Sequence, residues 1–259
     1  MTVSSIPVVR AVPRALEHLG GATVMAGQIL RVLPRPRLYM TSALQQAYTL
    51  GIQSLPLVLL MAFLGGAVTS QQTGAQFSGG LPLWVIGSVL AASMLTELGP
   101  LLTGIVLTAR VGASIAAELA TMKVTEQVDA LIAMGRDPVA FLVVPRVVAG
   151  ALVFPPLVMV ADAMGMFAGW GIGLLAVDGL TTADIVYGAR FYFRPWALWF
   201  SVIKGGVFGI AITFIACYVG LTGRGGAEGV GRTTTLAVVT TTIVLMIIDV
   251  LMIPVLKAF

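Results

Sequence analysis

Residues that could do chemistry are scarce in this chain, and Glu97 is the most isolated of them. It is the first charged residue after an uncharged run from Leu38 to Thr96. A carboxylate inside an apolar span is costly and by default marks a functional site. The Gly99-Pro100 pair that follows frees backbone groups, which only protein or a water-filled cavity can cover at membrane depth. We therefore expect Glu97 to face a cavity or a partner subunit, or else to be neutralised by packing or by pairing with Arg110.

A second cluster of charge lies in the segment EQVDALIAMGRDP (126–138), between two apolar stretches. Thr125 can cap a helix there, and Gly135 and Pro138 can end it. One side of this helix would be apolar, with Val128, Leu131, Ile132 and Met134. A helix of two to three turns is too short to be stable alone. The residues leave two interpretations open: docking in a groove of a partner protein, or lying on the lipid head groups.

Enzymatic sites are not predicted. With one histidine, His18, and one cysteine, Cys217, neither a catalytic triad nor a metal site can be assembled in a plausible place. No G-x-x-x-x-G-K-[ST] motif is present, so the chain does not bind ATP through a P-loop. The Gly-rich loop 223–231 lacks the lysine and the preceding strand, and is interpreted as a turn. Cys217 lies in an apolar run and is expected to be a buried free thiol.

The composition indicates a membrane protein. The chain is 58% hydrophobic and 10% charged, whereas a soluble domain has about 25% charged residues. Its mean hydropathy is +1.00. Segments of this chain that cross a membrane must be helical, because every backbone polar group there needs an internal hydrogen-bond partner. The net charge of +4 does not indicate nucleic-acid binding, since no basic patch is interleaved with aromatic residues.

The predicted fold is an all-α integral membrane protein with five transmembrane helices, an amino-terminal interfacial amphipathic helix and a cytoplasmic helix between spans two and three. We expect residues 1–37 to form an amino-terminal segment and 38–259 a single membrane domain. The helix at 15–33 is expected on the membrane surface, ended by Pro34 and Pro36, with a disordered tail as the alternative. The predicted spans are 47–70, 82–110, 145–177, 196–220 and 234–256.

Breaks are expected at several points of these spans. Pro56 should kink the first span, and the second should break near Gly99-Pro100. The third span would be roughly 50 Å long against a hydrocarbon core of about 30 Å, so one long, broken or tilted helix is expected, with Pro155-Pro156 and Asp162 at the break. The segments 70–80, 178–195 and 222–232 are interpreted as a turn and two loops.

The distribution of lysine and arginine predicts the topology. Five spans place ten of these residues with the amino terminus, 111–146 and 221–232, against three (Arg190, Arg194 and Lys257) on the other side. Arg110 and Lys204 lie near predicted span ends and are not counted. The positive-inside rule makes the ten-residue side cytoplasmic. The carboxy terminus is then on the opposite side of the membrane.

Glycines at helical spacing suggest close helix packing. Gly165, Gly169 and Gly173 are four apart, as are Gly205 and Gly209. Such faces let helices approach closely. General enrichment of glycine in membrane helices explains each pair about as well, and the triple is the better evidence.

The block from Thr96 to Pro138, TELGPLLTGIVLTARVGASIAAELATMKVTEQVDALIAMGRDP, with Pro145-Arg146 beyond it, resembles the signature region of MlaE/YrbE-type permeases. These are membrane subunits of ABC transporters that work with MCE proteins. The segment GGAEGVGRTTT (225–235) is similar to the family's second marker. The resemblance covers most of the chain.

This resemblance implies a lipid-transporting permease subunit without catalytic activity, in the bacterial inner membrane. It implies a dimer, most simply a homodimer, two separate ATPase subunits that bind the ATP, and an MCE-domain protein on the far side. A lipid pocket is implied near Thr96, Glu97, Leu98, Gly99 and Pro100. The best-known phospholipid members carry arginine where this chain has Thr96, which removes a possible head-group contact.

The resemblance also assigns the helix at 125–134 as the coupling helix that docks on the ATPase. The coupling residues would be Glu126, Gln127, Asp129, Ala130, Met134, Gly135, Arg136 and Asp137. Of these we expect Glu126, Asp129, Arg136 and Asp137 to face the partner, and Val128, Leu131 and Ile132 to pack inward.

Two other classes of function remain as alternatives. An ion-coupled carrier would use Glu97, Asp162 and Asp249 as proton sites, although the inverted repeats of such carriers are not evident. A membrane scaffold without a transport role is the other.

Overall fold

The computed structural model describes residues 7–77, 82–223 and 225–257. In this part of the chain the ordered elements are all helical, and five helices are long and apolar enough to cross a membrane. They run through Met40–Gln76, Trp84–Val124, Val139–Ala176, Pro195–Thr222 and Ala227–Pro254. The predicted all-helical fold with five spans, and a helix ahead of the first span, is therefore confirmed.

Several spans are built from more than one helical segment. The amino-terminal helix is α1 (Pro7–Val32), followed by a 3₁₀ turn at Pro36–Leu38. The first span consists of α2 (Met40–Gly51), a 3₁₀ turn (Ile52–Ser54) and α3 (Leu55–Phe77). The second consists of α4 (Trp84–Ser93), a π-helical turn (Met94–Leu98), α5 (Gly99–Leu107), a second π-helical turn (Thr108–Gly112) and α6 (Ala113–Val124).

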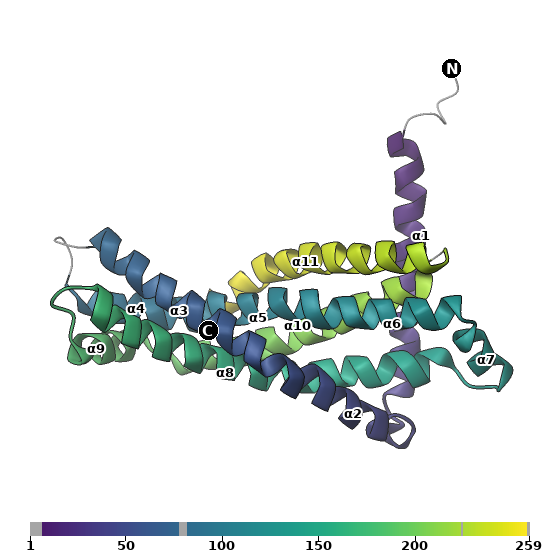
Figure 1. Cartoon of the computed structure of the whole chain (residues 1–259), viewed down its shortest axis with the longest axis horizontal. Coiled ribbons are helices and arrows are strands. Elements are labelled where there is room, and N and C mark those ends of the chain that lie inside the picture. The colour runs from purple at the N-terminus through teal and green to yellow at the C-terminus, as the bar shows by residue number, and fades with distance from the viewer. Residues whose placement is uncertain (1–6, 78–81, 224, 258–259) are drawn as a thin grey trace.

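The short helix α7 (Gln127–Ala133) connects spans two and three. The third span joins a π-helical turn (Val139–Val143) to α8 (Val144–Ala176), and α9 (Thr182–Tyr192) follows it. The last two spans are α10 (Pro195–Thr222) and α11 (Ala227–Lys257). The spans run along the long axis of the molecule, with α7 at one end and α4 and α9 at the other (Figure 1). The helix α1 crosses the bundle near the α7 end (Figure 1).

The orientation of α1 fits an amphipathic surface helix. It packs on the bundle through Met25 and Ile29, which are buried, while Leu16, Leu19 and Leu30 are exposed. It ends at Val32, ahead of the two prolines that were expected to stop it. The exposed leucines would be costly in water and suit the head-group region of a bilayer.

The predicted ends of the first span are wrong. The helix continues through residues 70–77, which were interpreted as a turn, because Ser70 and Thr73 are buried rather than hydrated. The hydroxyl of Thr73 donates a hydrogen bond to the carbonyl oxygen of Thr69, so this polar side chain needs no water. The 3₁₀ turn at Ile52–Ser54 ends two residues before Pro56, where a kink was expected.

The second and third spans continue where breaks were expected. The π-helical turn at Met94–Leu98 carries the helix past Gly99-Pro100, with the Gly99 N–H donating to the Met94 carbonyl five residues earlier. Helix α6 extends the second span to Val124, beyond its predicted end at residue 110. The helix α8 is one continuous helix of 33 residues with both prolines inside it, so the expected break at Pro155-Pro156 and Asp162 is wrong.

The interpretation of 178–195 as a loop is also wrong, because it contains α9. A capping box begins this helix: the Asp184 N–H donates to the Thr181 hydroxyl, and the Asp184 carboxylate accepts from the Thr181 N–H. The helix packs backbone to backbone on α4, where a Cβ on Gly188 would lie 1.8 Å from the Trp84 carbonyl oxygen. Part of the glycine-rich loop is helical as well, since α11 begins at Ala227.

The glycines of α8 and α10 lie at helix contacts. Gly165, Gly169 and Gly173 face α3 at Ala62, Gly66 and Ser70, which are likewise small and four residues apart. On the other side of α8, a Cβ on Gly209 of α10 would lie 2.4 Å from the Gly150 carbonyl oxygen, and one on Gly205 would lie 2.9 Å from a Val158 methyl group. Small residues thus let α3 and α10 approach α8 closely.

We expect Gly66→Ala to destabilise the bundle, because a Cβ at this position would lie 1.9 Å from the backbone oxygen of Gly165. The two helices would have to separate, at a cost of about 1–3 kcal/mol typical of overpacking. The measurement is the midpoint of thermal unfolding of the protein in detergent. Gly171→Ala is the matched control, since nothing lies within 4 Å of a Cβ there and alanine is the better helix former. Equal midpoints for the two variants would contradict the close contact.

Candidate functional site

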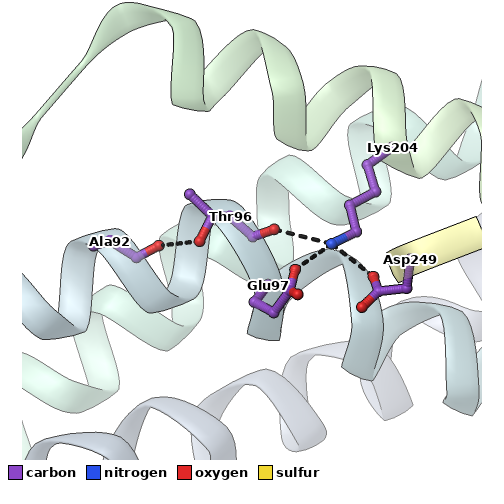
Figure 2. A network of polar contacts seen from close by, with 5 residues as sticks. All are labelled: Ala92, Thr96, Glu97, Lys204 and Asp249. Atoms are coloured by element: carbon purple, nitrogen blue, oxygen red, sulfur yellow. Dashed lines mark hydrogen bonds and ion pairs between the residues drawn. The ribbon is translucent and has the colours of Figure 1, made fainter. Parts of the chain in front are cut away.

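A buried lysine organises the centre of the site. Lys204 lies in the first half of α10, and its side chain is fully buried. Its ammonium group contacts the carboxylates of Glu97, in the π-helical turn of span two, and of Asp249, in α11 at 2.6 Å (Figure 2). It also donates a hydrogen bond of 3.0 Å to the carbonyl oxygen of Thr96. One cation thereby joins spans two, four and five.

The three partners contribute differently to this charge cluster of Glu97, Lys204 and Asp249. Glu97 forms a hydrogen-bonded ion pair, and its side chain keeps 38% of its surface exposed. Asp249 is 10% exposed, and its contact is an ion pair without hydrogen-bond geometry. The rings of Phe200 and Phe208 lie 5.5 and 6.0 Å from the ammonium nitrogen, within range of cation–π attraction. Glu97 is thus the member of the cluster that remains accessible.

Pro100 explains why a backbone oxygen is available to Lys204. In an α-helix the Thr96 carbonyl would accept from the N–H four residues later. That residue is Pro100, which has no N–H. The lysine ammonium supplies a donor to this oxygen instead. The Thr96 hydroxyl is used locally, donating 2.8 Å to the Ala92 carbonyl (Figure 2).

Gly99 brings the same turn against the third span. A Cβ on Gly99 would lie 1.6 Å from a carboxylate oxygen of Asp162, so only glycine fits. The other oxygen of Asp162 accepts a 2.6 Å hydrogen bond from the Ser201 hydroxyl of α10. Glu97, Gly99 and Pro100 therefore each serve a separate contact, while Leu98 is half-buried between them.

The expected pairing of Glu97 with Arg110 is not found. Arg110 lies in the second π-helical turn and donates a 2.6 Å hydrogen bond to the buried Ser54 hydroxyl. Both Arg110 and Lys204 were expected near span ends. Instead, Arg110 lies within the second span and Lys204 lies within α10. The sequence analysis missed Lys204 as a site residue, although a lone lysine within an apolar run is the kind of signal that marks such a site.

The second part of the site is α7, at the end of the bundle opposite α9 (Figure 1). Its carboxy-terminal cap is a Schellman motif: the Gly135 N–H donates to the Ile132 carbonyl and the Arg136 N–H to the Leu131 carbonyl. Gly135 has φ of +73°, which glycine adopts without strain. The Thr125 cap is wrong, because Glu126 precedes the helix with φ of +60° and the Thr125 hydroxyl donates back to Thr121.

Few side chains of α7 reach the bundle. Val128 is buried and Leu131 is half-buried, but Ile132 is 57% exposed and the inward packing expected for it is wrong. The residues assigned to coupling are all exposed: Glu126, Gln127, Asp129, Ala130, Met134, Gly135, Arg136 and Asp137. Two of them also act within the chain. Arg136 lies 5.2 Å from the ring centre of Phe141, and Asp137 accepts a hydrogen bond from the Val139 N–H at the start of span three.

Charged side chains also join α6, which precedes α7, to the third and fourth spans. Arg146 of α8 forms a 2.7 Å ion pair with Glu118 of α6 and donates to the Leu142 carbonyl. Lys123, near the end of α6, donates to the Leu221 carbonyl at the end of α10. The position of α7 therefore follows from that of α6.

Cys217 is a buried free thiol, as expected from the sequence.

Comparison with known proteins matches this architecture. The family model described as "Permease MlaE" matches residues 43–254. A "Probable ABC transporter permease protein" of Rickettsia felis is 39% identical over 231 residues, which is 89% of each chain. A protein of the same description from Synechocystis is 35% identical over 234 residues, 89% of this chain and 88% of that one. The protein TRIGALACTOSYLDIACYLGLYCEROL 1 of Arabidopsis thaliana is 38% identical over 227 residues, 87% of this chain and 64% of that one.

The family match covers most of the chain, with four of the five spans in full and all but the first three residues of the other. Together with the relatives named as ABC transporter permeases, it assigns ATP hydrolysis to a separate subunit, which agrees with the missing P-loop motif. The chain belongs to the MlaE permease family and is a non-catalytic, multi-pass membrane subunit of an ABC transporter.

Proposed function

We propose that this permease moves lipid between a bacterial inner membrane and an MCE-domain protein, driven by an ATPase that docks on α7. The observation that carries the proposal is α7 itself. It is a two-turn helix that buries Val128, half-buries Leu131 and exposes its remaining side chains. A helix of this length is not stable alone, so its capped, exposed form suits insertion into a groove of a partner.

The lipid part of the proposal is supported by one relative and by the site. The Arabidopsis relative carries the name of a diacylglycerol lipid. In this chain, the charge cluster leaves the Glu97 carboxylate partly exposed within a membrane-spanning helix. Thr96, Glu97, Leu98, Gly99 and Pro100 would then form the wall of the lipid site, with Glu97 as its accessible polar group.

The remaining partners and the orientation follow from the family resemblance and the charge distribution. A homodimer would place two copies of the Glu97 turn in one complex. The side that carries α7 is proposed to be cytoplasmic, because it holds most of the lysines and arginines outside the spans. The MCE-domain protein would then meet the opposite end, where α4 and α9 lie.

A proton-coupled carrier is less well supported by the contacts. Two of the three carboxylates that it would use, Glu97 and Asp249, are paired with one buried lysine. The third, Asp162, accepts from Ser201 and packs on Gly99. These contacts hold spans together, and a proton site would have to give them up in each cycle.

The proposal predicts ATP-dependent lipid transfer. The permease would be reconstituted with its ATPase and MCE-domain partners in vesicles that contain a fluorescent phospholipid, and transfer would be followed by loss of self-quenching. Transfer should require ATP and should be unchanged when a protonophore collapses the proton gradient. Transfer that runs without ATP and stops with the protonophore would support the carrier instead, and no transfer under either condition would support a scaffold.

We also expect the double charge reversal Glu126→Lys with Asp129→Lys to weaken ATPase binding roughly tenfold, as expected when charge complementarity across an interface is inverted. Both side chains are exposed and make no ion pair among the described residues, so the melting temperature of the permease should not change. Asp178→Lys, exposed at the opposite end of α8, is the control. Binding that survives the double reversal, or falls equally in the control, would contradict docking on α7.

A further inference from the structure

A small pocket opens between span two and the junction of α9 with α10. It has a volume of about 260 Å³. Ala91, Ala92 and Leu95 form one wall, and Tyr192, Phe193 and Ala197 form the other. Thr96 and Trp196 line it as well, and among the described residues Arg194 is the one charged residue of the lining. Pockets that enclose drug-sized ligands measure roughly 300–1,000 Å³, so this one has room for part of a lipid rather than for a whole two-chain molecule.

We propose that this pocket binds the anionic head group of a lipid and its first carbons, with Arg194 as the residue that contacts the head group. The identification of the ligand as a lipid rests on the function proposed above. The site itself rests on the pocket, its apolar walls and its single cation.

The Arg194 guanidinium is available for such a contact. The side chain is exposed, and within the described parts of the chain it takes part in no ion pair. Arg194 immediately precedes α10, has extended backbone angles and makes no capping hydrogen bond with its side chain. The positive end of the α10 dipole adds to its attraction for anions. A guanidinium presents a planar fork of donors that matches phosphate oxygens in pairs.

The walls favour an amphiphile over a free anion. Arg194 lies where α10 begins, at a membrane end of the bundle, and Tyr192 and Phe193 lie beside it. Aromatic residues at this depth are typical of the membrane–water interface. Ala91, Ala92 and Leu95 line the wall formed by span two, and their side chains offer no hydrogen-bond donor to an inorganic phosphate. A lipid can pair its anionic head group with Arg194 and pack its first carbons against this apolar wall.

The pocket also adjoins the charge cluster. Thr96 lines the pocket, and its carbonyl oxygen accepts a hydrogen bond from Lys204. The next residue, Glu97, pairs with the same ammonium group. A lipid in the pocket would therefore contact the π-helical turn Met94–Leu98, which binds the Lys204 ammonium group.

Trp196 offers a direct readout, because it lines the pocket. The full-length permease, with Trp84, Trp170 and Trp199 replaced by phenylalanine, would be placed in nanodiscs with its ATPase subunits. Quenching of Trp196 fluorescence would be compared between chain-brominated phosphatidylglycerol, which is anionic, and chain-brominated phosphatidylcholine at the same mole fraction. We expect phosphatidylglycerol to be preferred about fivefold, as one added cation–anion contact allows.

Arg194→Gln should abolish this preference, whereas Arg190→Gln, a neighbouring cation outside the pocket lining, should retain it. Equal quenching by the two lipids in the parent protein, or a preference that survives Arg194→Gln, would overturn the proposal. So would loss of the preference on adding inorganic phosphate but not sodium chloride of equal ionic strength, since the site would then take the free anion.

The same nanodisc samples distinguish the site from the transport function. A preference that depends on Arg194 in a complex that transfers no lipid in vesicles would uphold the site and refute the proposed function. ATP-dependent transfer without any head-group preference would uphold the function and refute the site.

Discussion

The position of the Lys204 ammonium group constrains much of the bundle. Removing an ammonium ion from water costs several kcal/mol even after relaxation, and attraction to carboxylates offsets this only when the geometry is good. In this chain the ion is fully buried, and its carboxylate partners come from two other spans. Spans two, four and five therefore cannot shift independently of one another. The need to pair this buried cation fixes the positions of the Glu97 carboxylate and the Thr96 carbonyl oxygen. It thereby fixes the position of the pocket that Thr96 lines.

The second span connects this cluster to the opposite end of the molecule. It is helical without interruption from Trp84 to Val124, and two π-helical turns accommodate Pro100 and Arg110 within it. Only two residues separate its end from α7. The Arg146–Glu118 ion pair and the bond from Lys123 to the α10 terminus hold this end in register with spans three and four. Span two is thus a continuous helical connection between α7 and the charge cluster.

The sequence predicted the fold class, the five spans and the exposed helix between spans two and three, because long apolar runs and a capped charged segment are local signals. It did not predict which charges meet. Lys204 was assigned to a span end, and Glu97 was considered with Arg110, because pairing depends on how helices far apart in sequence rotate against each other. Helix α9 was missed for another reason. Its Thr181–Asp184 capping box is visible in the sequence, but the charged residues around it are typical of a loop. The close contact of its Gly188 with α4 depends on the tertiary structure, which the sequence does not show.

The central claim, that the buried ammonium ion fixes spans two, four and five, is tested most directly by the thermal unfolding of Lys204→Met beside the triple variant Lys204→Met, Glu97→Gln, Asp249→Asn. The single change leaves two carboxylates without their cation, and breaking a buried pair in this way costs about 3–5 kcal/mol. The account predicts a marked loss in unfolding midpoint, or no folded protein, for the single variant, and substantial recovery in the uncharged triple variant. A single variant that melts with the parent protein, or a triple variant no more stable than the single, would contradict it.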